Sequence, residues 1–274
     1  MPEATKQPAV PARAANTFDE QATRYDARVG LPDSVGTAVA AEIMASAGLQ
    51  TEDLVLELGV GTGEIGMHLA RLPVCYLGID HSTEMLQLFR DKIGQDAASL
   101  LLADASHVWP LDDHAASVVF ASRVIHLLDA EHVARETHRV CRPGGWLMLG
   151  RVLRDGNGVK ERLRRRRLEL LELAGVGPLW GREGARRVVE HCLSVGGESM
   201  GRRVVAEWSG AISPAEVIAD WTSLSRMGSV EVDADRRQEI LGELQDWART
   251  ELGDLDHPET YRERYVIDCV RLPQ

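Results

Sequence analysis

A glycine-rich stretch between residues 54 and 66 constrains the possible fold more than any other part of the sequence. The apolar run 54–58 ends at Gly59, and further glycines follow at 61, 63 and 66. Glycine adopts backbone conformations that are closed to other residues and lets a ligand approach the main chain closely. The stretch therefore predicts a strand, a tight turn and a helix, with a nucleotide-like cofactor bound at the carboxyl end of the strand.

Short apolar runs and helical patterns alternate through the rest of the first half. Further runs rich in Val, Leu or Ile predict strands that are buried on both faces: Val74–Ile79, Ser99–Ala103, Ser117–Ala121 and Trp146–Arg151. Helices are predicted between these runs near 64–71, 82–93 and 130–140, and before them near 18–28 and 33–47. Ser82 and Asp129 stand where N-caps are expected. This alternation predicts the α/β class with a doubly wound, mostly parallel sheet.

The second half has a different pattern, which predicts a helical cap. We expect helices at 157–175 and 183–194, strands at 203–208 and 261–272, and two more helices, at 213–227 and 233–252, between these strands. The patterns divide the chain into a disordered lead-in (1–16), a cofactor-binding core (17–156) and a last part (157–274). This last part is expected to complete the sheet and to carry a substrate cap at about 210–258.

The composition limits the class of protein. No run approaches the roughly 20 consecutive apolar residues of a membrane span, and residues 1–15 lack the apolar core of a secretory signal. The net charge of −11, from 31 Lys and Arg against 42 Asp and Glu, disfavours non-specific nucleic-acid binding. The four cysteines are scattered and no cluster has metal-ligand spacing. We therefore expect buried, reduced thiols, no metal site and a cytoplasmic location.

Two kinds of cofactor fit the glycine-rich stretch taken alone. Gly61-x-Gly63-x-x-Gly66, followed by Asp80, matches the fingerprint of a dinucleotide site. Glu57, however, would repel a pyrophosphate and would favour a ligand that carries an ammonium or sulfonium group. Asp104 places a second carboxylate after the third strand, and the turn at 142–145 precedes the fifth. These features favour a cationic cofactor over NAD.

At this point the sequence resembles the class I S-adenosylmethionine-dependent methyltransferases, in particular the small-molecule group that includes ubiquinone- and menaquinone-type enzymes. The segments that carry the resemblance are FDEQATRYD at 18–26, LELGVGTG at 56–63, GIDHSTEML at 78–86, LLADASHVWPLDD at 101–113 and RPGG at 142–145. The resemblance implies a seven-stranded, Rossmann-like sheet and S-adenosylmethionine as methyl donor, with S-adenosylhomocysteine as product. It also implies a small-molecule acceptor, methylated by in-line displacement.

The resemblance also implies roles for the residues at the methionine end of the cofactor. The loop of Gly59, Gly61 and Gly63 would pass beneath the methionine part, with Glu57 near its ammonium group. Ser122, after the fourth strand, would lie close to the same end. Tyr25 would close over the cofactor or would instead fix the N-terminal helix.

The nucleoside end of the cofactor has its own implied residues. Asp80 would accept both ribose hydroxyls, while His81 and Met85 would border the adenine. Asp104 would accept from the adenine amino group, and Ala105 would donate its backbone N–H. For Asp80 and Asp104 the alternative is a purely structural role in helix capping or loop solvation.

His126 is the best candidate for a catalytic base, because it follows the fourth strand and an imidazole can accept a proton near neutral pH. The alternative is a histidine that only packs at a helix end. Arg123 is expected to pair with an acidic substrate, with Asp129 or with Glu131. Such a reaction needs a base only if the acceptor holds a proton when it attacks.

Other functions stay open at this level: an RNA or protein methyltransferase, a non-catalytic S-adenosylmethionine-binding protein and, least favoured, an NAD-dependent oxidoreductase. The arginine run 162–167 is flanked by glutamates, which favours a self-paired, solvated helix over a binding surface. Trp180 is a candidate for an acceptor pocket. The segment ARTELGDLD at 248–256 is unusual and carries no activity signature. The sequence leaves the acceptor and the oligomeric state open.

Overall fold

A seven-stranded sheet organises the computed structural model, which describes residues 30–94, 97–175, 183–222, 226–227 and 230–274. The strand order is β3-β2-β1-β4-β5-β9-β6, and every neighbouring pair from β3 to β5 is parallel, whereas β9 runs antiparallel to both β5 and β6. The strands are β1 (Leu54–Leu58), β2 (Cys75–Asp80), β3 (Ser99–Leu102), β4 (Ala116–Ser122), β5 (Cys141–Arg154), β6 (Glu198–Ile212) and β9 (Glu259–Arg271). The predicted fold class, a doubly wound and mostly parallel seven-stranded sheet, is confirmed.

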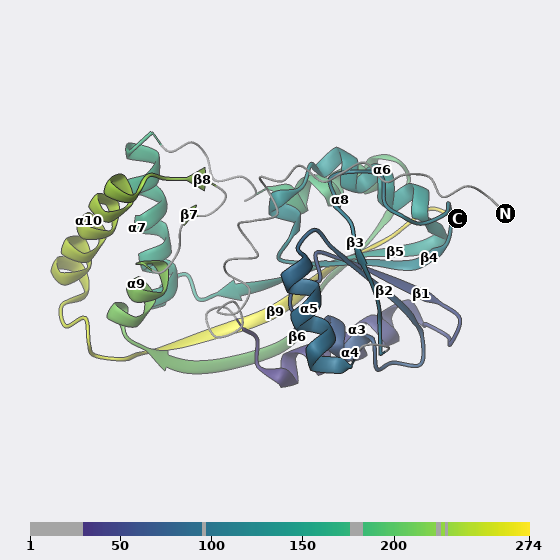
Figure 1. Cartoon of the computed structure of the whole chain (residues 1–274), viewed down its shortest axis with the longest axis horizontal. Helices are drawn as coiled ribbons and strands as arrows, with labels where there is room; N and C mark the ends of the chain where they lie inside the picture. Colours follow the sequence, from purple (N-terminus) through teal and green to yellow (C-terminus); the bar gives the residue numbers. More distant parts are fainter. Residues whose placement is uncertain (1–29, 95–96, 176–182, 223–225, 228–229) are drawn as a thin grey trace.

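Helices cover both faces of the sheet (Figure 1). They are α3 (Asp33–Ala47), α4 (Gly66–Leu69), α5 (Thr83–Ile93), α6 (Ala130–Val140), α7 (Val159–Leu173), α8 (Gly184–Ser194), α9 (Pro214–Thr222) and α10 (Ala234–Leu252), with a short 3-10 helix, η1, at Ile125–Leu127. The side chains of Ser82 and Asp129 cap α5 and α6, as the sequence predicts. The helix expected near 18–28 lies outside the described residues.

Two apolar cores lie on opposite faces of the sheet because side chains alternate along each strand. On one face, Leu56 and Leu58 of β1 pack in a core with α6 and α8. On the other face, Val55 packs in a core with α3 and α5. Glu57 lies on the same side of β1 as Val55, so its carboxylate enters the second core rather than solvent.

The turn expected at 142–145 is a bulge inside a strand and not a break before it. β5 begins at Cys141, and its register with β4 shifts between Ala116 and Val118, which leaves these residues unpaired with β4. Gly144 has a φ of 70° and donates its N–H to the carbonyl of Pro273 at 2.8 Å. Contacts with the C-terminal end of the chain thus hold the bulge in the sheet.

A third apolar core forms a helical lobe at one end of the long strands. β5, β6 and β9 continue past the shorter strands, and α7, α9 and α10 gather at that end (Figure 1). Leu163 of α7, Ile218 of α9 and Leu244 of α10 are buried together in this core. Because β5 is parallel to β1 and β4, the lobe lies toward the carboxyl ends of the parallel strands.

None of the helices in the described ranges has the length and apolar character that crossing a membrane requires. The cysteines are all free, and Cys141, Cys192 and Cys269 are buried as expected. Cys75 is exposed, so the expectation of buried thiols is wrong there. It is the first residue of β2, where the strand emerges from a turn.

Candidate cofactor site

The glycine-rich turn after β1 has the conformation that its sequence predicts. Gly59, Gly61 and Gly63 all have positive φ angles, of 62°, 53° and 83°. A Cβ at Gly59 would lie 2.5 Å from Cγ2 of Val124, and a Cβ at Gly63 would lie 2.2 Å from the ring of Phe89. A Cβ at Gly61 would meet nothing within 4 Å. The first and third glycines therefore allow the turn to pack, while the second faces open space.

The carboxylate of Asp80, at the end of β2, ties this turn to the next helix. Its Oδ2 accepts the N–H of Gly61 at 2.8 Å, and its Oδ1 accepts the N–H of Ser82 at 2.9 Å. Burial raises the pKa of Asp80, although these hydrogen bonds and His81 oppose the shift. These two hydrogen bonds give Asp80 the structural role that the sequence analysis left as an alternative. Two carboxylate oxygens offer about four acceptor positions, so hydroxyl groups can still be accepted.

Glu57 lies beneath the turn and is 3% exposed. The hydroxyl of Tyr76 donates to its Oε2 at 2.7 Å. Burial raises the pKa of Glu57 to about 8, an effect that the hydrogen bond from Tyr76 opposes and the charge of Asp80 reinforces. Glu57 thus holds a proton over much of the neutral pH range and releases it if a cation arrives.

A second tyrosine reaches the site from the last strand. The hydroxyls of Ser122, at the end of β4, and Tyr265, on β9, share a hydrogen bond of 2.6 Å. Tyr265 is fully buried, and a Cβ at Gly150 would lie only 2.0 Å from its hydroxyl. Burial raises the pKa of Tyr265 well above its usual value, so this hydroxyl stays protonated. The pair fixes the position of the Ser122 hydroxyl.

An ion pair between Arg123 and Glu64 lies at the same cleft. The other oxygen of Glu64 accepts the N–H of Leu31 at 2.8 Å, which connects the cleft to the start of α3. The pairing of Arg123 with Asp129 or Glu131 expected from the sequence is therefore wrong. Arg123 has a φ of 57°, and its turn away from β4 directs it toward the glycine-rich turn instead.

The residues implied for the nucleoside end lie along the carboxyl ends of β2 and β3. Asp104 accepts the N–H of Ser106 at 2.8 Å, and its pKa is lowered because hydrogen bonds and His107 outweigh the effect of burial. His81 lies 3.5 Å from Asp80 and its charge also acts on Asp104, which places it between the two carboxylates. Met85 is buried, and its N–H donates to the Ser82 cap.

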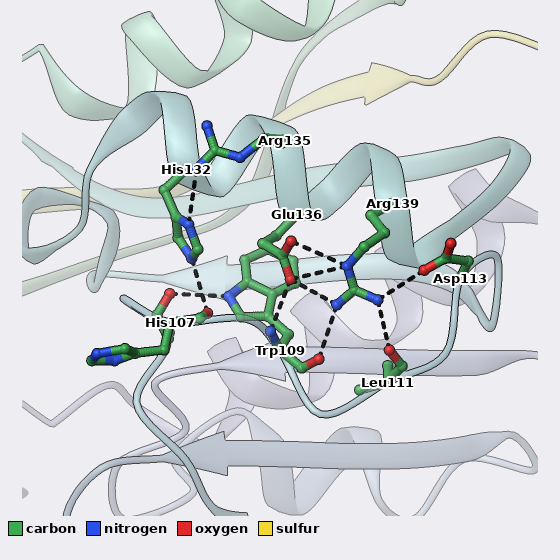
Figure 2. Close-up of polar contacts among 9 residues, drawn as sticks. His107, Trp109, Leu111, Asp113, His132, Arg135, Glu136 and Arg139 are labelled. Carbon is green, nitrogen blue, oxygen red and sulfur yellow. Dashed lines mark hydrogen bonds and ion pairs between the residues drawn. The ribbon is translucent and has the colours of Figure 1, made fainter. Parts of the chain in front are cut away.

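The loop that carries Asp104 and Ala105 is held by three side chains of α6, those of His132, Glu136 and Arg139 (Figure 2). Glu136 accepts the backbone N–H of Trp109 at 2.8 Å, and the Trp109 indole donates to the carbonyl of Ala105 at 3.0 Å. Arg139 pairs with Glu136 and donates to the carbonyls of Trp109 and Leu111. Burial alone would raise the pKa of Glu136, but Arg139 and the Trp109 N–H lower it.

His126 lies on η1, one turn beyond Ser122 and Arg123. Its side chain is exposed, yet neighbouring protein atoms partly desolvate it and Arg164 of α7 adds a positive charge nearby. Both effects lower the pKa of His126 and favour the neutral imidazole. Arg164 thus brings a positive charge of the helical lobe close to His126.

The structure brings only part of the predicted set into one cleft. Glu57, Gly59, Gly61 and Ser122 line a cleft of about 30 Å³ together with Glu64 and Arg123. Asp80 adjoins it through its bond to Gly61. The cleft lining does not include the other described candidates, which are Gly63, His81, Met85, Asp104, Ala105 and His126. Tyr25 and Trp180 lie outside the described residues.

Sequence patterns missed Glu64, Tyr76, Glu136, Arg139 and Tyr265. One signal for Tyr76 exists in hindsight, because Gly66 and Gly78 would both place a Cβ within 3 Å of its hydroxyl. Tyr265 has no such local signal, since it lies 143 residues from Ser122 in the chain.

Comparisons with known proteins agree with this geometry. Residues 56–149 match a family described as a methyltransferase domain. An uncharacterized methyltransferase of Mycobacterium tuberculosis is 32% identical over 125 residues, or 40% of this chain and 50% of that protein. A malonyl-(acyl-carrier protein) O-methyltransferase of Marinomonas is 30% identical over 138 residues, or 49% of each. The chain spans about half the length of the curated relatives that it matches.

Residues 56–149 thus form a methyltransferase domain, in agreement with the resemblance to the class I S-adenosylmethionine-dependent methyltransferases. The similarity in fold extends beyond residues 56–149. The solved structure of a proposed type II methyltransferase from Anaeromyxobacter dehalogenans has a TM-score of 0.59 and 18% identity, over 87% of this chain and 97% of that one. The cofactor of the family is S-adenosylmethionine, as the sequence implies.

The residue types of the methyltransferase domain are compatible with this cofactor. Gly61 leaves space where a side chain would stand, and buried carboxylates lie on either side of the turn. The cleft itself is far smaller than the roughly 300–1,000 Å³ of ordinary ligand pockets. The cleft must therefore widen before a molecule of that size is admitted.

We expect Gly61→Ala to reduce mainly the cofactor affinity and Gly63→Ala to reduce mainly the folding free energy. The methyl group at 61 meets no protein atom, so the variant should lose only about 1 kcal/mol from backbone strain while cofactor affinity falls at least tenfold. The methyl group at 63 overlaps Phe89, so this variant should lose about 3 kcal/mol of folding free energy. Urea denaturation and calorimetry measure both effects, and equal destabilisation would contradict the assignment of open space to Gly61.

Glu57→Gln should change how stability depends on pH. The folded protein keeps a proton on Glu57 that the unfolded chain loses above about pH 4.5, so the free energy of unfolding falls as pH rises toward 8. The slope contributed by this group is at most about 1.4 kcal/mol per pH unit. The glutamine variant lacks this contribution and should be progressively more stable than the parent between about pH 5 and pH 8. Parallel stability curves in urea denaturation would contradict the protonated state.

Glu136→Gln should weaken both the fold and the loop after β3. We expect a loss of about 2 kcal/mol, because Arg139 and the Trp109 N–H lose a charged acceptor. Cofactor affinity should also fall severalfold, since Asp104 and Ala105 lie on this loop. The control is Glu131→Gln, an exposed position on the same helix, which should change stability by less than about 0.5 kcal/mol. Equal effects of the two substitutions would rule out the positioning role.

Proposed function

We propose that this protein transfers a methyl group from S-adenosylmethionine to a small-molecule acceptor. The observation that carries the proposal is the glycine-rich turn, with Gly61 facing open space between the carboxylates of Glu57 and Asp80. Both carboxylates lie at the carboxyl ends of parallel strands, where α/β sheets bind nucleotide-like ligands. The family match over residues 56–149 supports the same cofactor.

The proposed cofactor residues act by binding and orientation. Glu57, whose pKa is raised by burial, becomes the carboxylate that faces the ammonium group. Asp80 accepts the ribose hydroxyls while it keeps the turn closed. Asp104 and the N–H of Ala105 bind the adenine edge, beside His81 and Met85. When bound, the cofactor supplies a methyl group already activated by the positive charge of its sulfonium.

The remaining cleft residues exclude water and orient the reacting groups. Ser122, fixed by Tyr265, stands at the methionine end, and separation of Arg123 from Glu64 opens the cleft. Such positioning supplies much of the rate enhancement when the donor is already activated. Tyr25, from the preceding segment, closes over the bound cofactor.

The acceptor approaches from the side of η1 and α7. Desolvation by neighbouring atoms and the charge of Arg164 lower the pKa of His126 and favour the neutral imidazole, which can take a proton from an O–H or N–H acceptor. The relative named for malonyl-(acyl-carrier protein) supports a small acceptor group. We assign residues 17–156 to cofactor binding and residues 157–274 to completion of the sheet and the substrate cap. A ubiquinone- or menaquinone-type acceptor is one member of this class.

Calorimetry with separate ligands tests the proposal. We expect micromolar affinity for S-adenosylmethionine and S-adenosylhomocysteine and no binding of NAD. Asp80→Asn should weaken the binding of both at least tenfold, because the amide loses charge and part of its acceptor capacity. It should also lower the melting temperature, since Asp80 holds the N–H groups of Gly61 and Ser82.

The control for this experiment is Asp91→Asn, an exposed site on α5. It should leave both affinity and melting temperature unchanged. NAD binding without a response to S-adenosylmethionine would overturn the proposal, as would normal S-adenosylmethionine binding by a folded Asp80→Asn variant.

A further inference from the structure

The helical lobe contains a much larger open pocket than the cleft at the glycine-rich turn. Its volume is about 790 Å³, within the range of small-molecule sites. It is lined by Ala215, Ile218, Ala219 and Thr222 of α9, Gln245 and Arg249 of α10, and the following loop 253–256. None of these residues lines the cleft at the turn, and all lie outside the matched methyltransferase domain.

The walls of this pocket are anchored on both sides. The backbone N–H of Ala215 donates to the carbonyl of Leu255 at 3.0 Å, which fixes the loop against the start of α9. Ser213 and Glu216 form reciprocal capping bonds at the same helix end. Just below, Ile212 of β6 pairs with Glu259 of β9. The pocket is therefore supported by the paired ends of β6 and β9.

The lining combines an apolar floor with uncompensated negative charge. Ile218 is buried in the lobe core, and Leu255 packs against the same core. Arg249 already pairs with Asp246 at 2.8 Å. In the part of the chain that the structure describes, Asp254 and Asp256 have no ion-pair partner. The charge complement of this pocket is a cation.

We propose that this pocket binds a small organic cation with an apolar body, such as a protonated amine on an aromatic or aliphatic group. The apolar part lies on Ile218, Ala219 and Leu255, while the cationic group faces Asp254 and Asp256. The segment at 248–256, for which the sequence offered no role, supplies half of the lining. The pocket lies in the part of the chain that we assign to the substrate cap, but the inference uses neither the cofactor residues nor His126, so it can be tested separately from methyl transfer.

Amide chemical shifts test the inference on the full chain, with 2-phenylethylammonium as the probe. We expect shifts to concentrate at residues 215–222 and 245–256. The neutral 2-phenylethanol should bind at least fivefold more weakly, and the anionic 3-phenylpropanoate should not bind. S-adenosylhomocysteine, titrated in parallel, should instead shift residues near 57–66 and 80–82, so the two sites succeed or fail separately.

Two variants separate charge from shape. The double substitution Asp254→Asn and Asp256→Asn should weaken the ammonium probe at least fivefold without changing the affinity for the alcohol. Ala219→Trp should abolish binding of both by filling the pocket. The matched control is Asp235→Asn, about 20 Å along α10 from Arg249, which should bind the probe normally. Equal affinity for ammonium and alcohol, unchanged binding by the double variant, or shifts confined to other regions would each overturn the proposal.

Discussion

The two hydrogen bonds that the Asp80 carboxylate accepts hold the candidate site together. One comes from Gly61 in the turn after β1, and the other from Ser82 at the start of α5. Without them, two backbone donors beside a buried strand end would lack partners, at a cost of about 1–3 kcal/mol each. The Asp80 carboxylate therefore stabilises the fold in the absence of any ligand. A substitution of Asp80 therefore affects the stability of the turn whatever its effect on ligand binding.

Local patterns predicted the strands of the main sheet and most of the helices because these depend on neighbouring residues. The helix predicted at 213–227 is wrong at its end: α9 stops at Thr222, and the short strands β7 (Arg226–Met227) and β8 (Val230–Glu231) pair with each other beyond it. Leu54–Leu58 is a strand over the predicted range, and Ser82 and Asp129 cap the helices that follow them. The glycine-rich turn follows from sequence too, since only glycine tolerates its positive φ angles. Where a neighbour strand decides the outcome, the patterns fell short: the predicted strand at 203–208 extends over Glu198–Ile212 because β9 pairs along its length.

The side-chain partners at the site were not predictable, because each joins residues that are distant in the chain. Glu57 and Tyr76 are 19 residues apart, Glu64 and Arg123 are 59 apart, and Ser122 and Tyr265 are 143 apart. Sequence reasoning assigned Arg123 to nearby carboxylates, whereas its positive φ turns it toward Glu64. Strand order also decides that Tyr265 reaches Ser122, since β9 inserts between β5 and β6.

The division of the apolar cores separates the candidate cofactor site from the helical lobe. The two cores on the sheet faces bury the strands whose ends carry Glu57, Asp80 and Ser122, and the third core buries the lobe helices among themselves. Substitutions inside the third core therefore leave the glycine-rich turn unstrained. The long strands β5, β6 and β9 connect these regions, and Arg164 of α7 adds to the desolvation that lowers the pKa of His126.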